Sequence, residues 1–257
     1  GAVTSIDFDI KNNGRGPTDA ETITSNADGL PVAWSIKGAT TFGSKVEESF
    51  KQSGSKAEWR DSTGKGSAKI AKPGLYVAQS GSPWGDAIIA KALLKAPDMT
   101  LAALPGGTLR LEKGETLAVK GAGGPAKVTR YDLTGIDLTP TTLLLDAKGD
   151  LFAEVSPDSI LIRKGYEGEE VRLRKLAADW STARFVDMEK QVAHRYAGPV
   201  RIRNVRLFDP AASALTAPVS VLVRGKEIAA VEPLDSPATP GEVTIDGAGG
   251  TLVAGLY

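Results

Sequence analysis

The chain has 257 residues, in which 31 lysines and arginines balance 31 acidic residues, and it contains no cysteine. This balance gives no reason to expect nucleic acid or an anionic membrane as partner. The missing thiols exclude disulfides, thiolate metal sites and a cysteine nucleophile. A single histidine excludes a metal site made of two or three imidazoles, although a Ser-His-Asp triad needs only one.

The length favours about two domains, and 41% apolar residues are enough to build cores. The low aromatic content of 6% and the 29 glycines are typical of turn-rich β structure. No apolar run approaches the roughly 20 residues that span a bilayer, so we expect no membrane span. No signal peptide is visible.

Residues 1–165 are predicted to form an antiparallel β-rich domain. Ile6, Phe8 and Ile10 alternate with polar residues, as do Val32, Trp34 and Ile36 further on. Two apolar runs between Leu143 and Val155 flank Asp146-Ala-Lys-Gly149, which predicts a hairpin. One helix is expected inside this domain: it would begin at Ser82-Pro83 and end at Ala96-Pro97.

Residues 166–198 are predicted to form a long linker helix. Acidic residues from Glu167 suit the positive end of its dipole, and apolar residues recur at helical spacing from Leu173 to Tyr196. Gly198-Pro199 would end it.

Residues 199–257 return to short strands, with Gly225-Lys226 as a two-residue turn. So few residues make a thin core by themselves, which indicates that this region needs a partner surface.

Four segments of this last region stand in a specific order: Ile202–Asp209, Val219–Arg224, Lys226–Val231 and Val243–Val253, followed by Gly255-Leu256. Together they resemble the entry domain of the metal-dependent amidohydrolases. Two small departures are Arg224-Gly225-Lys226, where the family often has Asp-Gly or Asn-Gly, and Ala254, where it often has proline.

The resemblance implies that residues 199–257 are the N-terminal half of a composite β-sandwich, whose other half follows a metal-binding (β/α)₈ barrel. Zinc or another divalent metal in that barrel would activate water to attack a C–N or related bond. The segment Thr251–Tyr257 should lead into an Asp-x-His-x-His motif, which this chain does not contain. We therefore expect a truncated, non-catalytic portion of a hydrolase, with no catalytic, cofactor-binding or metal-binding residue of its own.

In the spacing of their expected strands, residues 1–165 resemble the curved half-barrel sheets of bacterial envelope lipoprotein carriers. That resemblance implies a periplasmic or secreted protein, although a cytoplasmic location stays open. Two alternatives also stay open. Residues 1–165 could be a binding module for an apolar ligand or an envelope partner, without catalysis. Alternatively, the partner barrel could be a separate chain.

Several features suggest sites but are better explained structurally. His194 is expected on the surface near a helix end. The glycine clusters Gly121–Gly124 and Gly247–Gly250 lack the Lys-Ser/Thr tail of a phosphate loop and are expected to be tight turns. The pair Asp7 and Asp9 fits a solvated strand face, and the segment Asp146–Asp150 has too few oxygens for an EF-hand.

The arginines and tryptophans are also given structural roles. Five arginines are expected in interdomain salt bridges rather than in a nucleic-acid stripe: Arg172, Arg174, Arg201, Arg203 and Arg206. Four tryptophans are expected to anchor cores or interfaces: Trp34, Trp59, Trp84 and Trp180. The overall expectation is an α+β chain in which strands predominate.

Overall fold

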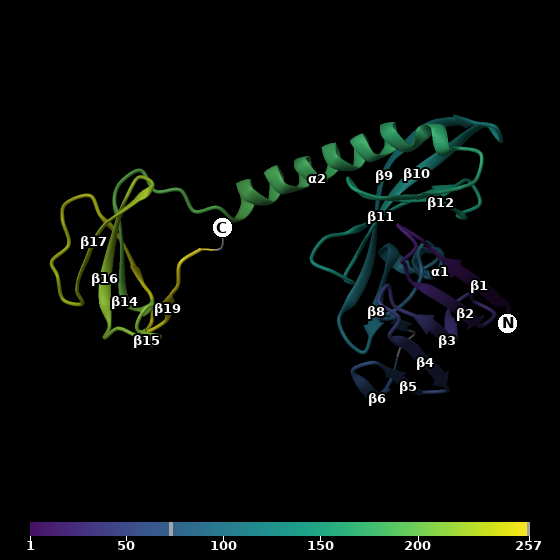
Figure 1. The fold of residues 1–257 in the computed structure, drawn as a ribbon, viewed down its shortest axis with the longest axis horizontal. Helices are drawn as coiled ribbons and strands as arrows, with labels where there is room; N and C mark the ends of the chain where they lie inside the picture. The colour runs from purple at the N-terminus through teal and green to yellow at the C-terminus, as the bar shows by residue number, and fades with distance from the viewer. Residues whose placement is uncertain (72–73, 256–257) are drawn as a thin grey trace. The chain divides into compact units, whose positions relative to one another are not determined.

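The computed structural model describes residues 1–71 and 74–255, and it forms two compact units, residues 1–184 and 185–257. Figure 1 shows that strands predominate over helices and that one helix is long, as the sequence predicts. The described residues form mainly antiparallel sheets and no (β/α)₈ barrel.

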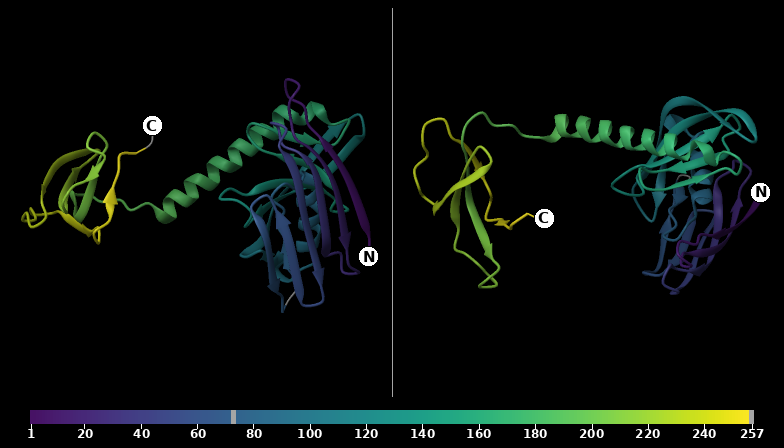
Figure 2. Two further views of the ribbon diagram at one scale, coloured as in Figure 1. Left: turned by 60° about the horizontal axis from the view of Figure 1, so that its bottom comes forward. Right: turned by 45° about the horizontal axis from the view of Figure 1, so that its top comes forward.

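The first unit begins with a six-stranded antiparallel meander, seen as the purple and blue strands in the left panel of Figure 2. Residues two apart on a strand share a face, and one face carries buried residues of the core such as Ile23, Trp34 and Phe50. We call this the inner face and the solvent-facing side the outer face. The strands are β1 (Val3–Asp9), β2 (Thr18–Ser25), β3 (Pro31–Ala39), β4 (Lys45–Ser53), β5 (Lys56–Asp61) and β6 (Gly64–Lys69).

A second, seven-stranded sheet completes the first unit, in the order β13-β12-β11-β10-β9-β8-β7. The predicted hairpin is β11 and β12, and its turn places Gly149 at a φ of +75°, which glycine adopts without strain. The strands are β7 (Gly74–Tyr76), β8 (Thr100–Leu104), β9 (Thr108–Gly121), β10 (Gly124–Thr134), β11 (Thr141–Asp146), β12 (Leu151–Val155) and β13 (Ile160–Ile162).

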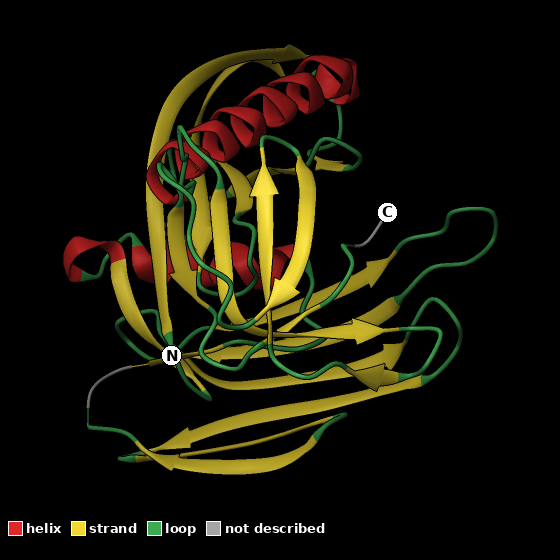
Figure 3. Ribbon diagram, turned by 90° about the vertical axis from the view of Figure 1, so that its left-hand side faces the viewer, coloured by secondary structure: helices red, strands yellow, loops and turns green. Residues whose placement is uncertain are grey.

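Two helices cover the second sheet, and Figure 3 shows both in red. Helix α1 (Pro83–Leu93) begins and ends near its predicted limits and shares one core with the inner face of the first sheet. On the other side of the second sheet, Leu144 and Val128 pack in a separate cluster with Leu173 and Ala177 of α2 (Glu170–Val192). Short 3-10 helices lie at Pro97–Met99 and Glu167–Glu169.

Helix α2 differs from the linker predicted over residues 166–198. It is shorter, because its last turn closes with the Ala193 amide on the Glu189 carbonyl, so His194 and Tyr196 lie beyond it. Its first half packs against the second sheet through Leu173, Ala177 and Trp180. The boundary between the compact units therefore falls inside α2, after Arg184.

The second unit is a small sheet centred on β14 (Val200–Asp209). Its antiparallel neighbours are β15 (Ala214–Leu215) and β16 (Val219–Arg224), and β16 pairs with β17 (Glu227–Pro233). Two later strands, β18 (Val243–Asp246) and β19 (Thr251–Leu252), run parallel to β14. The predicted turn joins β16 to β17, with Gly225 at a φ of +60°.

Among the described residues, no helix has the length and apolar character needed to cross a membrane.

Candidate functional site

One face of the second unit is built from branched aliphatic side chains. Strand register aligns them in two rows, each crossing four strands. A register shift between Leu222 and Val223 keeps Ile228 and Val231 of β17 on the same side despite their odd spacing. We call this the valine face, and it consists of Val200, Ile202, Val221, Val223, Ile228, Val231, Val243 and Ile245.

The valine face is incompletely covered. Ile228 is 70% exposed and Val231 51% exposed, whereas Val221 is buried. In the described part of this unit, the fully buried apolar side chains are Val205, Val221 and Leu222. An apolar sheet face left this open is typical of a surface that packs against another layer.

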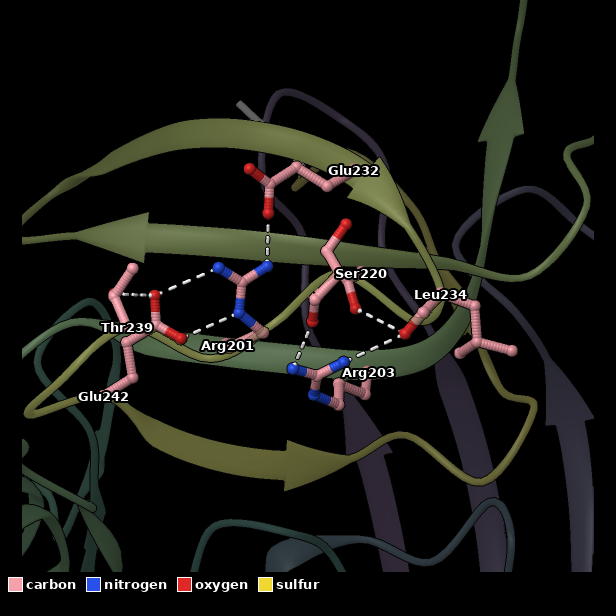
Figure 4. Close-up of polar contacts among 8 residues, drawn as sticks. Arg201, Arg203, Ser220, Glu232, Leu234, Thr239 and Glu242 are labelled. Atoms are coloured by element: carbon pink, nitrogen blue, oxygen red, sulfur yellow. Dashed lines mark hydrogen bonds and ion pairs between the residues drawn. The ribbon is translucent and has the colours of Figure 1, made fainter.

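The opposite face of the same sheet is organised around a buried arginine, shown in Figure 4. Arg201 donates to Glu242 through Nε at 2.8 Å and Nη2 at 3.0 Å, and it also pairs with Glu232. The side chains of Arg201 and Glu242 are 2% and 0% exposed. A bidentate pair of this kind satisfies both buried charges.

These contacts fasten the proline-containing loop between β17 and β18 to the sheet. Arg203 donates to the carbonyls of Leu234 and Ser236, at 3.0 and 2.5 Å. The hydrogen bonds from Arg201 and Thr239 lower the pKa of Glu242 to about 2, and Glu242 and Glu232 raise the pKa of Arg201. The polar face is thereby closed by its own loop, while the valine face has no such cover from this loop.

The first unit also contains buried charge, in the form of carboxylates on the inner face. Glu21 accepts hydrogen bonds from Trp34 Nε1 at 2.9 Å and from the Ser82 amide at 2.7 Å. Glu48 accepts from the Tyr76 hydroxyl at 2.6 Å and from two loop amides. Both carboxylates hold the segment that leads into α1, so their role is structural.

Two further carboxyls near α1 have raised pKa values. Burial, followed by the charges of Glu154, Glu21 and Asp137, raises the pKa of Asp86 to about 8. Burial raises the pKa of Glu154 to about 7, and its Oε2 has no hydrogen-bond partner among the described residues. Although raised pKa values often mark functional sites, no three carboxylates or histidines of the described residues are placed to hold a metal ion.

The residues singled out in the sequence do not come together. His194 is exposed, as predicted, but lies past the end of α2 rather than within it, with its ring 6.5 Å from that of Tyr196. The two glycine clusters are tight turns, as predicted: the first joins β9 to β10, and Gly250 closes the second on Gly247.

The candidate acidic pairs are used locally. Asp7 is exposed and Asp9 pairs with Lys11, as a solvated face requires. Asp146 accepts the amides of its own turn and binds Arg163, and Asp150 binds Lys91.

The expectation of interdomain salt bridges is wrong for the arginines with described partners. Arg172 and Arg174 bind Glu169 and Glu170 within the first unit. Arg201 and Arg203 bind only within the second unit, and Arg206 is exposed. Strand alternation places Arg201 on the closed polar face, so its partners come from the same unit: Glu232 from β17 and Glu242 from the loop before β18.

Three of the four tryptophans lie in cores, as predicted. Trp34 is buried, Trp59 packs against the same core, and Trp180 packs against the second sheet. Arg130 lies over the Trp180 ring at 4.6 Å from its centre. The exception is Trp84, which is 43% exposed.

The segment Thr251–Tyr257, which is expected to lead into the metal-binding motif, begins with β19, which pairs with Arg206 and Leu207 of β14. Its last two residues, Leu256 and Tyr257, lie outside the described part of the chain.

No family model matches the chain, and no curated protein matches it. Among solved structures, a DUF1089 family protein from Pseudomonas aeruginosa is similar, with a TM-score of 0.31 and 11% sequence identity. The match covers 59% of this chain and 88% of that one. A TM-score this low supports no conclusion about function.

Proposed function

We propose that this chain is the N-terminal, non-catalytic portion of a metal-dependent amidohydrolase. Residues 199–257 would supply one layer of a composite β-sandwich, and the valine face would pack against the layer that follows the catalytic barrel. The observation that carries the proposal is the open valine face, with Ile228 70% and Val231 51% exposed, on the segment that resembles the family's entry domain. The hydrolase activity would reside in the barrel, on the same or a separate chain.

The division of labour follows from the residues present. Buried carboxylates such as Glu21 and Glu48 accept hydrogen bonds from loop amides. No group of three carboxylates or histidines in the described residues could hold a metal ion. A barrel partner would supply zinc or another divalent ion, which activates water for attack on a C–N bond. This chain would supply packing area and no reacting group.

The coding sequence after Tyr257 tests the proposal. An Asp-x-His-x-His motif immediately downstream supports it, and a stop codon there removes the single-chain version. For the separate-chain version, the test is metal analysis of the purified 257-residue chain. We expect no stoichiometric zinc, and a tightly bound equivalent would contradict the proposal.

The binding-module alternative stays a prediction that no contact in the structure favours. An apolar ligand on the inner face would have to displace the core formed by side chains such as Ile36, Ile89 and Leu143. A location in the bacterial envelope likewise stays a prediction.

A further inference from the structure

The outer face of the first sheet is hollowed over strands β2–β6. The hollow is more open than enclosed, and its volume of about 820 Å³ is a size that a small molecule can occupy. Small side chains form its middle, and strand register sets them in rows. One row runs through the hydroxyls of Thr22, Ser35 and Ser49 and ends at Arg60 and Lys65.

Arg60 and Lys65 are directly opposite each other in the β5–β6 hairpin. Residues so placed on one face have Cβ atoms about 5 Å apart, and like charges there are destabilising. Neither side chain forms an ion pair with a residue that the structure describes. The hairpin therefore holds two exposed cations side by side without an ion-pair partner among the described residues, although the charge of Arg60 contributes to the lowered pKa of Glu47.

The surrounding face neutralises them only in part. The outer face of the sheet carries four carboxylates: Asp7 and Asp9 on the edge strand β1, and Glu47 and Glu58 on β4 and β5. Asp9 binds Lys11, Glu47 binds Lys45, and Glu58 binds Lys56 at 2.7 Å. Glu58 also stands opposite Lys51. The cations on that face outnumber the acids: they are Lys37, Lys45, Lys51, Lys56, Arg60, Lys65 and Lys69. This excess contrasts with the zero net charge of the whole chain.

We propose that this hollow binds a phosphate monoester of a sugar or polyol. The phosphate lies between Arg60 and Lys65, whose donors form charge-assisted hydrogen bonds to its oxygens. The hydroxyl groups of the ligand lie along Thr22, Ser35 and Ser49, which can each donate and accept. The row favours a polar ligand over a purely apolar one, because an apolar ligand would make no use of these hydroxyls and cations. This site uses no residue of the valine face, so it stands or fails independently of the proposed function.

Calorimetric titration of the 257-residue chain at constant ionic strength tests the site, with glucose 6-phosphate, glucose and inorganic phosphate as probes. We expect saturable binding of glucose 6-phosphate, weaker binding of phosphate and none of glucose. The double variant Arg60→Gln/Lys65→Gln should weaken binding at least about tenfold, since both charged contacts are lost. Ser35→Ala/Ser49→Ala should weaken glucose 6-phosphate binding and leave phosphate binding unchanged.

The matched control is Lys45→Gln/Lys56→Gln, which removes the same charge from the same face at lysines that already bind carboxylates. It should change the affinity by less than about twofold, because only long-range attraction is reduced. Equal loss in both double variants would show unspecific attraction and overturn the proposal. Absence of saturable binding, or binding of glucose as tight as that of its phosphate, would also overturn it. All these side chains are exposed or half-buried, and the far-ultraviolet circular dichroism of each variant verifies its fold.

Discussion

The two compact units bury apolar residues to very different extents. In the first unit, two sheets and α1 enclose one cluster, and α2 closes a second on the far side of the seven-stranded sheet. In the second unit, one sheet has a closed polar face and an open valine face, with only a few fully buried apolar side chains. The first unit supplies its own second layer, whereas the described residues of the second unit leave part of the valine face exposed.

The units also differ in how they accommodate buried charge. In the first unit, Glu21 and Glu48 accept hydrogen bonds from neutral donors, and the charges that act on Asp86 are those of the acidic Glu154, Glu21 and Asp137. In the second unit, Arg201 is matched by Glu242 and Glu232. We infer that the folded structure of the second unit depends on this ion pair. The folded structure of the first unit depends mainly on apolar packing.

The largest effect should follow from Arg201→Ala. This change leaves Glu242 without its bidentate partner in a place where its side chain is 0% exposed, and an unpaired buried charge is strongly destabilising. We expect residues 200–252 to lose their folded structure while residues 1–184 keep theirs. Hydrogen exchange measured along the whole chain distinguishes the two units.

Arg206→Ala is the control for this experiment, because Arg206 lies on the same strand but is exposed. It should change the free energy of unfolding by less than about 0.5 kcal/mol. If Arg201→Ala kept its protected amides in residues 200–252, the second unit would not depend on the ion pair, and the contrast between the units would fail.

A smaller effect, confined to the first unit, should follow from Glu48→Gln. Glu48 accepts hydrogen bonds at both carboxylate oxygens, from the Tyr76 hydroxyl and from the amides of Gln79 and Ser80. Glutamine has the same shape but only one acceptor oxygen, so it cannot accept all three. We expect a loss of about 2–3 kcal/mol, since hydrogen bonds to a buried charged group are involved. Urea unfolding measures it, with Glu47→Gln, on the outer face of the same strand, as the nearly neutral control.

The stability of the first unit should depend on pH through the titration of Asp86. Its folded-state pKa of about 8 lies above its ordinary value of 3.8, so between these values the unfolded chain binds fewer protons than the folded one. Stability therefore falls as the pH rises from about 4 to about 8, and it is unaffected by Asp86 below that window. Glu154, with a pKa of about 7, acts in the same direction.

Asp86→Asn removes the part of this dependence that is due to Asp86 and should stabilise the first unit more at pH 8.5 than at pH 5. Melting temperatures at the two pH values measure the effect, with exposed Asp28→Asn as the control. A stabilisation of equal size at both pH values would show that Asp86 is not the titrating group.

Patterns that depend on neighbours in sequence were predictable. The alternation of Trp34 and Ile36, the proline that opens α1, and the glycine turns at Gly149 and Gly225 all appear as expected. Each is set by local backbone preference and by which face of a strand is buried.

Features that depend on distant partners were not predictable. Arg201 alternates with Val200 and Ile202, as a solvated residue would, and only the return of Glu242 from a later loop makes it a buried ion pair. The apolar residues in the first half of α2 predict a packed helix face but do not reveal which sheet they contact. The unpaired cations Arg60 and Lys65 become neighbours only through the register of β5 and β6.

The smallest effect on stability is expected on the valine face itself. Val231→Lys puts a charge on a side chain that is 51% exposed, so the free energy of unfolding should change by less than about 0.5 kcal/mol. Val221→Lys, in the same cross-strand row but buried, should unfold the unit. Thermal melts of the two variants compare open and closed positions within one row. If Val231→Lys destabilised the chain as much as Val221→Lys, then Val231 would already be covered in solution, and the second unit would have found its missing layer in another copy of this chain.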